Sequence, residues 1–240
     1  MNLFEALHRL LSCSHPLILR HPDEYYPFFR GTCFTVCYDG KLFVLSAFHC
    51  FEKVDVRATR IDCGGRENEH FPLKCWSYFE NPGFIDSDLR DMAIFEVDMG
   101  RMTDAEICRA PRLDLADNFV AASQLPKRCD LILEGFPYEL AEFSPEFHVT
   151  IRPSCKLLGI YEGPTERLGI SKLSIPEFGN LGDLNGMSGS PVLAVRQSLD
   201  HELKYCLAGM LIQGSVAGKC GYFIQADVLI KALKRCVQNC

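Results

Sequence analysis

The sequence has no long apolar run and no excess of basic residues. No stretch approaches the ~20 consecutive apolar residues that a membrane-spanning helix needs, so we expect no membrane association. The formal net charge is −6 and no run of like charge reaches five residues, which argues against charged tails and a nucleic-acid partner. A hydrophobic fraction of 48% in 240 residues is ample for one large domain or two small ones.

The N-terminus lacks the basic start of a secretory signal. Glu5, His8 and Arg9 interrupt its apolar residues, which also differs from the core of such a signal. We therefore expect a cytoplasmic protein. In that compartment the 13 cysteines, an odd and high number, are expected to stay reduced.

The cysteines also lack the spacing of a zinc site. Cys33 and Cys37 form one close pair and Cys236 and Cys240 another. Residues four apart on a strand share a face but lie about 13 Å apart, so such pairs are poor ligand sets. We expect neither a metal ion nor a cofactor.

Short apolar stretches separated by turn residues predict a β protein. Stretches at this spacing are typical of a sandwich or a barrel. The first set of expected strands is Thr32–Tyr38, Leu42–Ser46, Val54–Ile61, Lys74–Phe79 and Met92–Val97. After a connector, the second set is Leu131–Leu133, His148–Arg152, Leu157–Tyr161, Leu173–Ile175, Pro191–Val195, Cys206–Ile212 and Tyr222–Ile224.

Both ends of the chain carry apolar residues at helical spacing. The N-terminal positions are Leu3, Phe4, Leu7, Leu10 and Leu11, and the C-terminal positions are Val228, Leu229, Ala232, Leu233 and Val237. The N-terminal helix would pack on the β-structure or dock a partner. From His15 to Arg30, three prolines predict irregular chain.

The most informative motif places a serine between two glycines, in Gly186-Met187-Ser188-Gly189-Ser190-Pro191. A nucleophilic serine needs a tight backbone on both sides. Glycines let two amide N–H groups turn toward one point, where a tetrahedral oxyanion would sit. The same pattern also occurs in plain turns, so its meaning depends on what lies upstream.

A histidine and an aspartate upstream each lie at the edge of an expected strand. An Asp-Gly turn at residues 39–40 predicts a hairpin, and His49 follows its second strand, where it can point into a cleft. Asp91 opens the apolar run Met92–Val97. A carboxylate there can be held beside an imidazole, fixing its tautomer and stabilising its charged form.

Together these motifs resemble those of the trypsin/chymotrypsin-like serine peptidases. Residues 46–50 (Ser-Ala-Phe-His-Cys) are similar to the family's histidine motif, residues 91–94 (Asp-Met-Ala-Ile) to its aspartate motif, and residues 186–191 to its serine motif. Residues 31–36 (Gly-Thr-x-Phe-x-Val) resemble its first-barrel hairpin, particularly in bacterial branches. The resemblance covers residues 27 to 237, and three motifs in the family's order are far more specific than one.

The resemblance implies an all-β fold of two antiparallel six-stranded barrels, chymotrypsin-like, with the site in the cleft between them. A short N-terminal helix and a C-terminal helix flank the barrels. The implied parts are an N-terminal helix and extension at 1–26, a first barrel at 27–115, a connector at 116–127, a second barrel at 128–225 and a C-terminal helix at 226–240.

The resemblance also implies a His49-Asp91-Ser188 triad that works through an acyl-enzyme, with the amides of Gly186 and Ser188 as the oxyanion hole. Asp86 and Asp88 look like a solvated loop, and Asp88 stays open as an alternative partner for the histidine. Among exported relatives a disulfide lies near the histidine, so Cys33 and Cys50 could be neighbours, but no bond is expected in a reducing compartment.

By the same resemblance, the substrate-binding residues are Gly182, Asp183, Ile212, Gln213 and Gly214. Gly182 would take the floor of the pocket that receives the side chain before the cleaved bond. An acid at Asp183 could favour lysine or arginine there, or it could face solvent in a Gly-Asp turn; both interpretations stay open. Digestive members carry an aspartate where this chain has Met187, so activation by the family's N-terminal ion pair is not expected.

The leading hypothesis is a serine endopeptidase that cleaves a specific intracellular protein or peptide. No separate recognition domain is visible, so a regulatory or activating protein partner, a restricted pocket or ordering of the loop at 178–184 would control it. Stand-alone bacterial domains of this kind resemble defence or stress effectors. Two alternatives remain: a catalytically silent barrel that binds proteins, and a quality-control protease.

Overall fold

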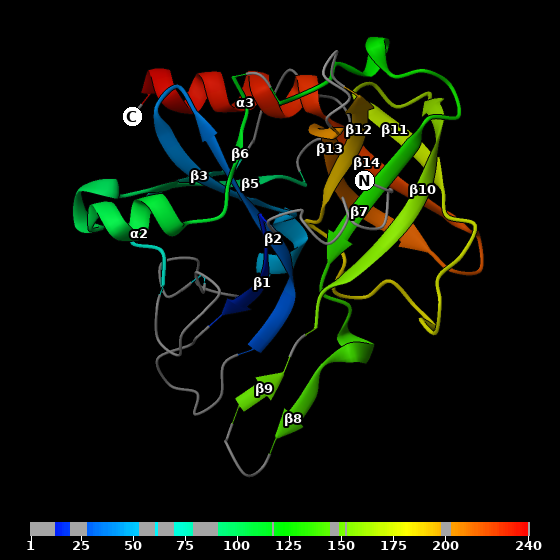
Figure 1. Ribbon diagram of the computed structural model, residues 1–240, viewed down its shortest axis with the longest axis horizontal. Helices are drawn as coiled ribbons and strands as arrows, with labels where there is room; N and C mark the ends of the chain where they lie inside the picture. The colour runs from blue at the N-terminus through cyan, green and yellow to red at the C-terminus, as the bar shows by residue number, and fades with distance from the viewer. Residues whose placement is uncertain are drawn as a thin grey trace.

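The computed structural model describes residues 13–19, 28–52, 61, 70–78, 91–116, 118–144, 149–151, 153–197 and 203–239. Its described part is mostly β, with one closed barrel lying beside one open sheet (Figure 1). The expected N-terminal helix and the strand expected to begin at Val54 lie outside these residues, apart from Ile61.

The open sheet is built around a hairpin. Its members are β1 (Ser14–Leu19), β2 (Phe28–Tyr38), β3 (Lys41–Ser46), β4 (Leu73–Tyr78), β5 (Ala93–Val97) and β6 (Leu113–Asp114). The order is β1-β2-β3-β5-β4, with β6 parallel to β2. Asp39 and Gly40 have φ angles of 51° and 71°, which suits a tight hairpin turn and confirms the one expected there.

One expectation for this sheet is shown only in part, and another is wrong. The described residues do not close it into a barrel, so a first six-stranded barrel is not shown. The irregular chain expected from His15 is wrong over β1, which pairs antiparallel with β2, so the sheet begins before residue 27. Pro16 is compatible with this strand because β1 is the edge of the described sheet, where a missing N–H costs no ladder hydrogen bond.

The second set of strands closes into the six-stranded barrel expected over residues 128–225. Its members are β7 (Asp130–Gly135), β10 (Cys155–Pro164), β11 (Ile170–Ser174), β12 (Pro191–Gln197), β13 (Leu203–Ser215) and β14 (Cys220–Gln225). They pair in the order β10-β11-β14-β13-β12-β7. Fully buried side chains such as Leu133, Leu173 and Phe223 fill the interior, which is the main source of its stability.

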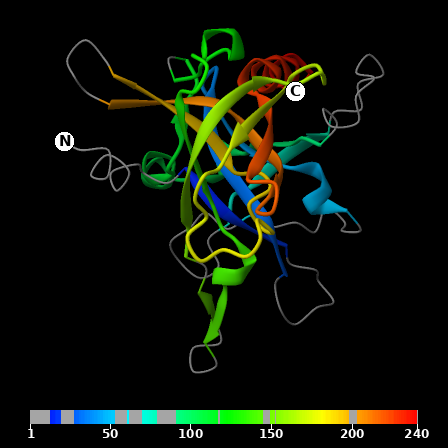
Figure 2. The same ribbon diagram turned by 90° about the vertical axis from the view of Figure 1, so that its right-hand side faces the viewer.

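One expected strand does not belong to the barrel. β9 (Val149–Ile151), expected as His148–Arg152, pairs only with β8 (Glu142–Ser144) among the described residues. The two strands form a hairpin that projects away from the barrel, at the bottom of Figure 1 and Figure 2. A three-residue strand with alternating apolar side chains fits a small hairpin as well as a barrel, so the pattern did not separate the two.

The C-terminal helix is confirmed as α3 (Ala226–Asn239), which buries Leu229 and Leu233 against β13 and β14. A further helix, α2 (Asp104–Arg109), was not expected; Thr103 and Glu106 form a capping box at its start. The described helices include none with the length and apolar character needed to cross a membrane.

Candidate active site

The serine motif lies in the loop between β11 and β12, and its glycines have conformations that other residues rarely adopt. Gly186 has φ +93° and Gly189 has φ +87°. A Cβ atom at Gly186 would lie 2.4 Å from the Phe136 carbonyl oxygen, and one at Gly189 would lie 2.0 Å from that of Thr32. Glycine is required at both positions because the backbone of other elements approaches so closely.

A residue of the open sheet clamps this loop of the barrel in place. The Thr32 N–H of β2 donates to the Ser188 carbonyl oxygen at 2.9 Å, and Thr32 Oγ1 donates to the Gly186 carbonyl oxygen at 2.8 Å. Ser46 Oγ of β3 in turn donates to the Thr32 carbonyl oxygen at 2.7 Å. The serine loop and the histidine strand are therefore held in one hydrogen-bonded unit.

Gly189→Ala is expected to lower the free energy of unfolding by several kcal/mol. The alanine would add backbone strain of about 1–3 kcal/mol and a clash with the Thr32 carbonyl oxygen. Gly179→Ala is the matched control: Gly179 also has positive φ, +61°, but no atom lies within 4 Å of a Cβ there. Denaturant unfolding measures both variants. Equal losses would contradict a tight clamp between Thr32 and the serine loop.

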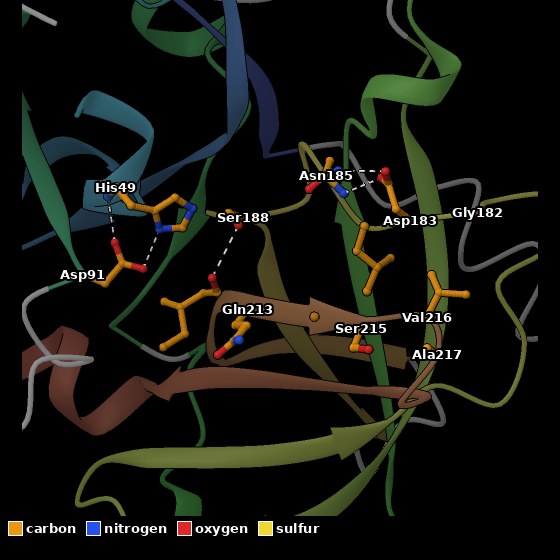
Figure 3. Close-up of a pocket in the computed structure, with 13 residues that line it drawn as sticks. His49, Asp91, Gly182, Asp183, Asn185, Ser188, Gln213, Ser215, Val216 and Ala217 are labelled. Carbon is orange, nitrogen blue, oxygen red and sulfur yellow. Dashed lines mark hydrogen bonds and ion pairs between the residues drawn. The ribbon is translucent and has the colours of Figure 1, made fainter. Parts of the chain in front are cut away.

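His49 and Asp91 meet because their strands are neighbours. His49 lies in the short 3-10 helix η1 (Phe48–Phe51) after β3, and Asp91 lies two residues before β5, with Ser46 opposite Ala93 in the ladder. Asp91 Oδ2 accepts from His49 Nδ1 at 2.7 Å, and Oδ1 accepts from the His49 backbone N–H at 2.8 Å (Figure 3). Both carboxylate oxygens thus hold the same residue. Asp86 and Asp88 lie outside the described residues.

This contact sets the charge and the orientation of the imidazole. The hydrogen bond to Asp91 and, after it, one to Cys50 raise the pKa of His49 to about 10, against the opposing effect of partial burial. With Nδ1–H directed at Asp91, the other ring nitrogen faces Ser188 (Figure 3). That arrangement suits a general base acting on the serine hydroxyl.

Ser188 is not yet engaged by the histidine. Ser188 Oγ donates to the Ile212 carbonyl oxygen at 3.4 Å, and within the described residues it makes no hydrogen bond to His49. The hydroxyl must turn toward the ring before a proton can be transferred. Catalytic hydrogen bonds are often long in the absence of substrate and tighten when it binds.

Two backbone amides at the serine are left for a ligand. The neighbouring N–H groups donate within the protein: Met187 to Leu184 O, Gly189 to Leu211 O and Ser190 to Met187 O. Among the described residues, the N–H groups of Gly186 and Ser188 donate to no backbone carbonyl. A cavity of about 200 Å³ lies against Gly186 and Ser188 and is also lined by His49, Arg30, Cys50, Tyr138 and Asn185.

A second cavity, of about 550 Å³, brings together the three residues expected to form a triad and all the expected substrate-binding residues. It is lined by His49, Asp91, Gly182, Asp183, Leu184, Asn185, Ser188, Ile212, Gln213, Gly214, Ser215, Val216 and Ala217. One wall is the segment before the serine and the other is the end of β13 with the turn after it (Figure 3). The sites expected from sequence thus share one cleft.

Asp183 lines this cleft with its carboxylate already engaged. Asp183 Oδ1 accepts from the Asn185 N–H at 2.8 Å, and Oδ2 accepts from Asn185 Nδ2 at 2.7 Å. Gly182 is held from the other side, since its N–H donates to Glu139 Oε2 at 2.7 Å. Of the two interpretations for Asp183, the turn therefore has direct hydrogen bonds in its favour.

Several lining residues were not expected from sequence. Leu184 and Asn185 could have been found from their position beside the serine motif. Arg30 and Tyr138 carry no local signal, because only the packing of β2 against the loop after β7 brings them to Ser188. Tyr138 packs edge-on against Phe29, with ring centroids 4.8 Å apart.

The structure joins no two of the cysteines that it describes in a disulfide. Cys33 Sγ donates to the His15 carbonyl oxygen at 3.6 Å. Cys50 Sγ lies instead against Gly31, at 2.8 Å from the place where a Cβ of that residue would be. Within the described residues, no three histidine, cysteine or acidic side chains gather as metal ligands.

No protein-family model matches the chain, and a search of curated proteins finds no relative.

Proposed function

We propose that this protein is a serine endopeptidase with a chymotrypsin-like site. The observation that carries the proposal is the cleft itself. The Asp91 carboxylate holds His49 through both oxygens, and the imidazole faces Ser188, which lies between two glycines with positive φ (Figure 3). The proposal includes the family's two-barrel fold, of which the open sheet and the closed barrel are the described parts. Peptidase function is inferred from this geometry and from the motif resemblance.

The proposed reaction is acyl transfer. Ser188 Oγ attacks a peptide carbonyl carbon while His49 takes the hydroxyl proton, and the N–H groups of Gly186 and Ser188 stabilise the resulting oxyanion. One such donor is typically worth about 3 kcal/mol in the barrier. His49 then gives its proton to the leaving amine as the C–N bond breaks. Water, activated by the same imidazole, hydrolyses the acyl-enzyme.

The end of β13 offers an edge on which an extended substrate could pair. β12 pairs with β13 only as far as Met210, whereas Gln213, Gly214 and Ser215 pair with β14 on the other side. The edge of residues 213–215 that faces the cleft has no strand partner among the described residues. A peptide added there as a strand would bring its carbonyl group toward Ser188.

Met187 supports a site that needs no proteolytic activation of the digestive type. Its side chain is fully buried among the barrel's apolar residues. An uncharged thioether there cannot form an ion pair with a new N-terminal amine. The proposal includes activation by a protein partner and a role in defence or stress.

One observation favours the alternative of a silent binding barrel, namely the missing hydrogen bond between Ser188 and His49. Digestion of a proteome-derived peptide library separates the two functions. We expect new peptide ends with the wild-type protein and none with Ser188→Ala. Identical end patterns in the two samples, or none in either, would contradict the peptidase.

The pH dependence of the reaction follows from the raised pKa of His49. A general base acts only when neutral, and the ordinary histidine pKa is about 6.5. Because Asp91 raises the pKa of His49 to about 10, the rate of ester hydrolysis is expected to rise with pH well above neutrality. Initial rates between pH 6 and pH 10 measure this profile. A plateau reached by pH 7 would contradict it.

A further inference from the structure

Leu184 occupies the space between the two walls of the cleft. It belongs to the segment before the serine, yet its side chain contacts the opposite wall at Gly214. A Cβ atom at Gly214 would lie 2.3 Å from Leu184 Cδ1 and 3.4 Å from both Leu184 Cβ and Cγ. Gly214 is therefore covered on its cleft side by the leucine, and a side chain at this position would have to displace the leucine's Cδ1.

The leucine is packed rather than free to swing aside. Its side chain is 7% exposed and lies in one apolar cluster with Phe178, Leu181 and Met187, with Val216 packed against it. Its carbonyl oxygen accepts the Met187 N–H at 3.0 Å, which fixes the backbone one turn before Ser188. Moving the side chain out would expose apolar surface, at about 25 cal/mol per Å².

This position decides what can lie beside the scissile bond. If the substrate carbonyl sits at Ser188 and the chain pairs along residues 213–215, the side chain next to that carbonyl must enter between the two walls. Leu184 lies in that entrance, against Gly214. Asp183, on the same wall, directs both carboxylate oxygens to Asn185 and away from the opposite wall (Figure 3).

We propose that Leu184 restricts this serine peptidase to cleavage after small residues, namely glycine, alanine and serine. The inference rests on the proposed function and adds its substrate class. Larger side chains must displace the packed leucine, whereas a methyl group is small enough to lie beside it. One methylene in an apolar pocket already changes selectivity by about 10–200-fold. A whole phenylalanine ring is therefore expected to change it by well over about 10-fold.

The test uses peptidyl diphenyl phosphonates that differ only in the side chain before the reactive phosphorus: alanine, leucine, phenylalanine and lysine. Intact-mass kinetics give each inactivation rate at Ser188. We expect the alanine reagent to react at least about 100-fold faster than the phenylalanine reagent with the wild type. Leu184→Ala is expected to raise the rate of inactivation by the phenylalanine reagent at least about 10-fold. The ratio of the alanine rate to the phenylalanine rate is then smaller than in the wild type.

Leu181→Ala is the matched control, because Leu181 is also 7% exposed and in the same loop and cluster but does not line the cleft. It should keep the wild-type ratio. A wild type that takes phenylalanine as fast as alanine would overturn the inference while leaving the peptidase intact, even if Leu184→Ala fails to fold. An ethyl fluorophosphonate, which has no such side chain, reports the proposed function separately; no labelling by it would overturn both.

Discussion

Ser188→Ala is expected to lower hydrolysis of an activated ester, such as the thiobenzyl ester of blocked alanine, by about 10⁶-fold, the loss seen when a serine nucleophile is removed. The covalent step disappears because Ser188 carries the hydroxyl that the His49 ring faces (Figure 3). His49→Ala should cost about as much, and the double variant no more than either alone. Such non-additivity arises because a nucleophile and its base act as one unit.

Ser190→Ala is the matched control for this result. Ser190 lies two residues further along the same motif but is fully buried and does not line either cavity at the site. It should keep most of the activity. If Ser190→Ala lost activity as completely as Ser188→Ala, or if Ser188→Ala kept it, the assignment of the nucleophile would be wrong.

Asp91→Asn is expected to lower the same rate by about 10⁴-fold with little change in the structure, because an amide at this position favours the wrong imidazole tautomer. It should also move the pH profile. Asp91 is the main cause of the raised pKa of His49, so its neutralisation brings that pKa down toward the ordinary value. The remaining activity should then level off at a lower pH than in the wild type.

Asp88→Asn tests the acid that the sequence left open and serves as the control. If Asp91 is the partner, Asp88→Asn leaves both the rate and the pH profile close to wild type. A large loss in Asp88→Asn, with Asp91→Asn nearly unaffected, would reassign the triad. The geometry favours Asp91, which accepts two hydrogen bonds from His49.

The sequence predicts the local features of this protein well. The Asp-Gly hairpin, the C-terminal helix and most barrel strands follow from turn residues and apolar periodicity, which depend on near neighbours in the chain. The sequence also predicts a tight backbone at the two motif glycines, which have positive φ in the structure.

What the sequence could not predict depends on contacts between distant segments. The covering of Gly214 by Leu184 joins positions 30 residues apart, and an isolated leucine beside a motif is compatible with many environments. The clamp by Thr32 joins two sheets. The sequence does not predict β1, because three prolines between His15 and Arg30 indicate irregular chain, whereas an edge strand tolerates Pro16.

The most direct test of a working serine and histidine is labelling of the purified protein with a fluorophosphonate probe, beside Ser188→Ala and His49→Ala. The probe reacts with an activated serine and needs no knowledge of the substrate. The account predicts a label on Ser188 in the wild type and none in either variant. A wild-type protein that stays unlabelled, or a label that persists in Ser188→Ala, would contradict the proposed active site.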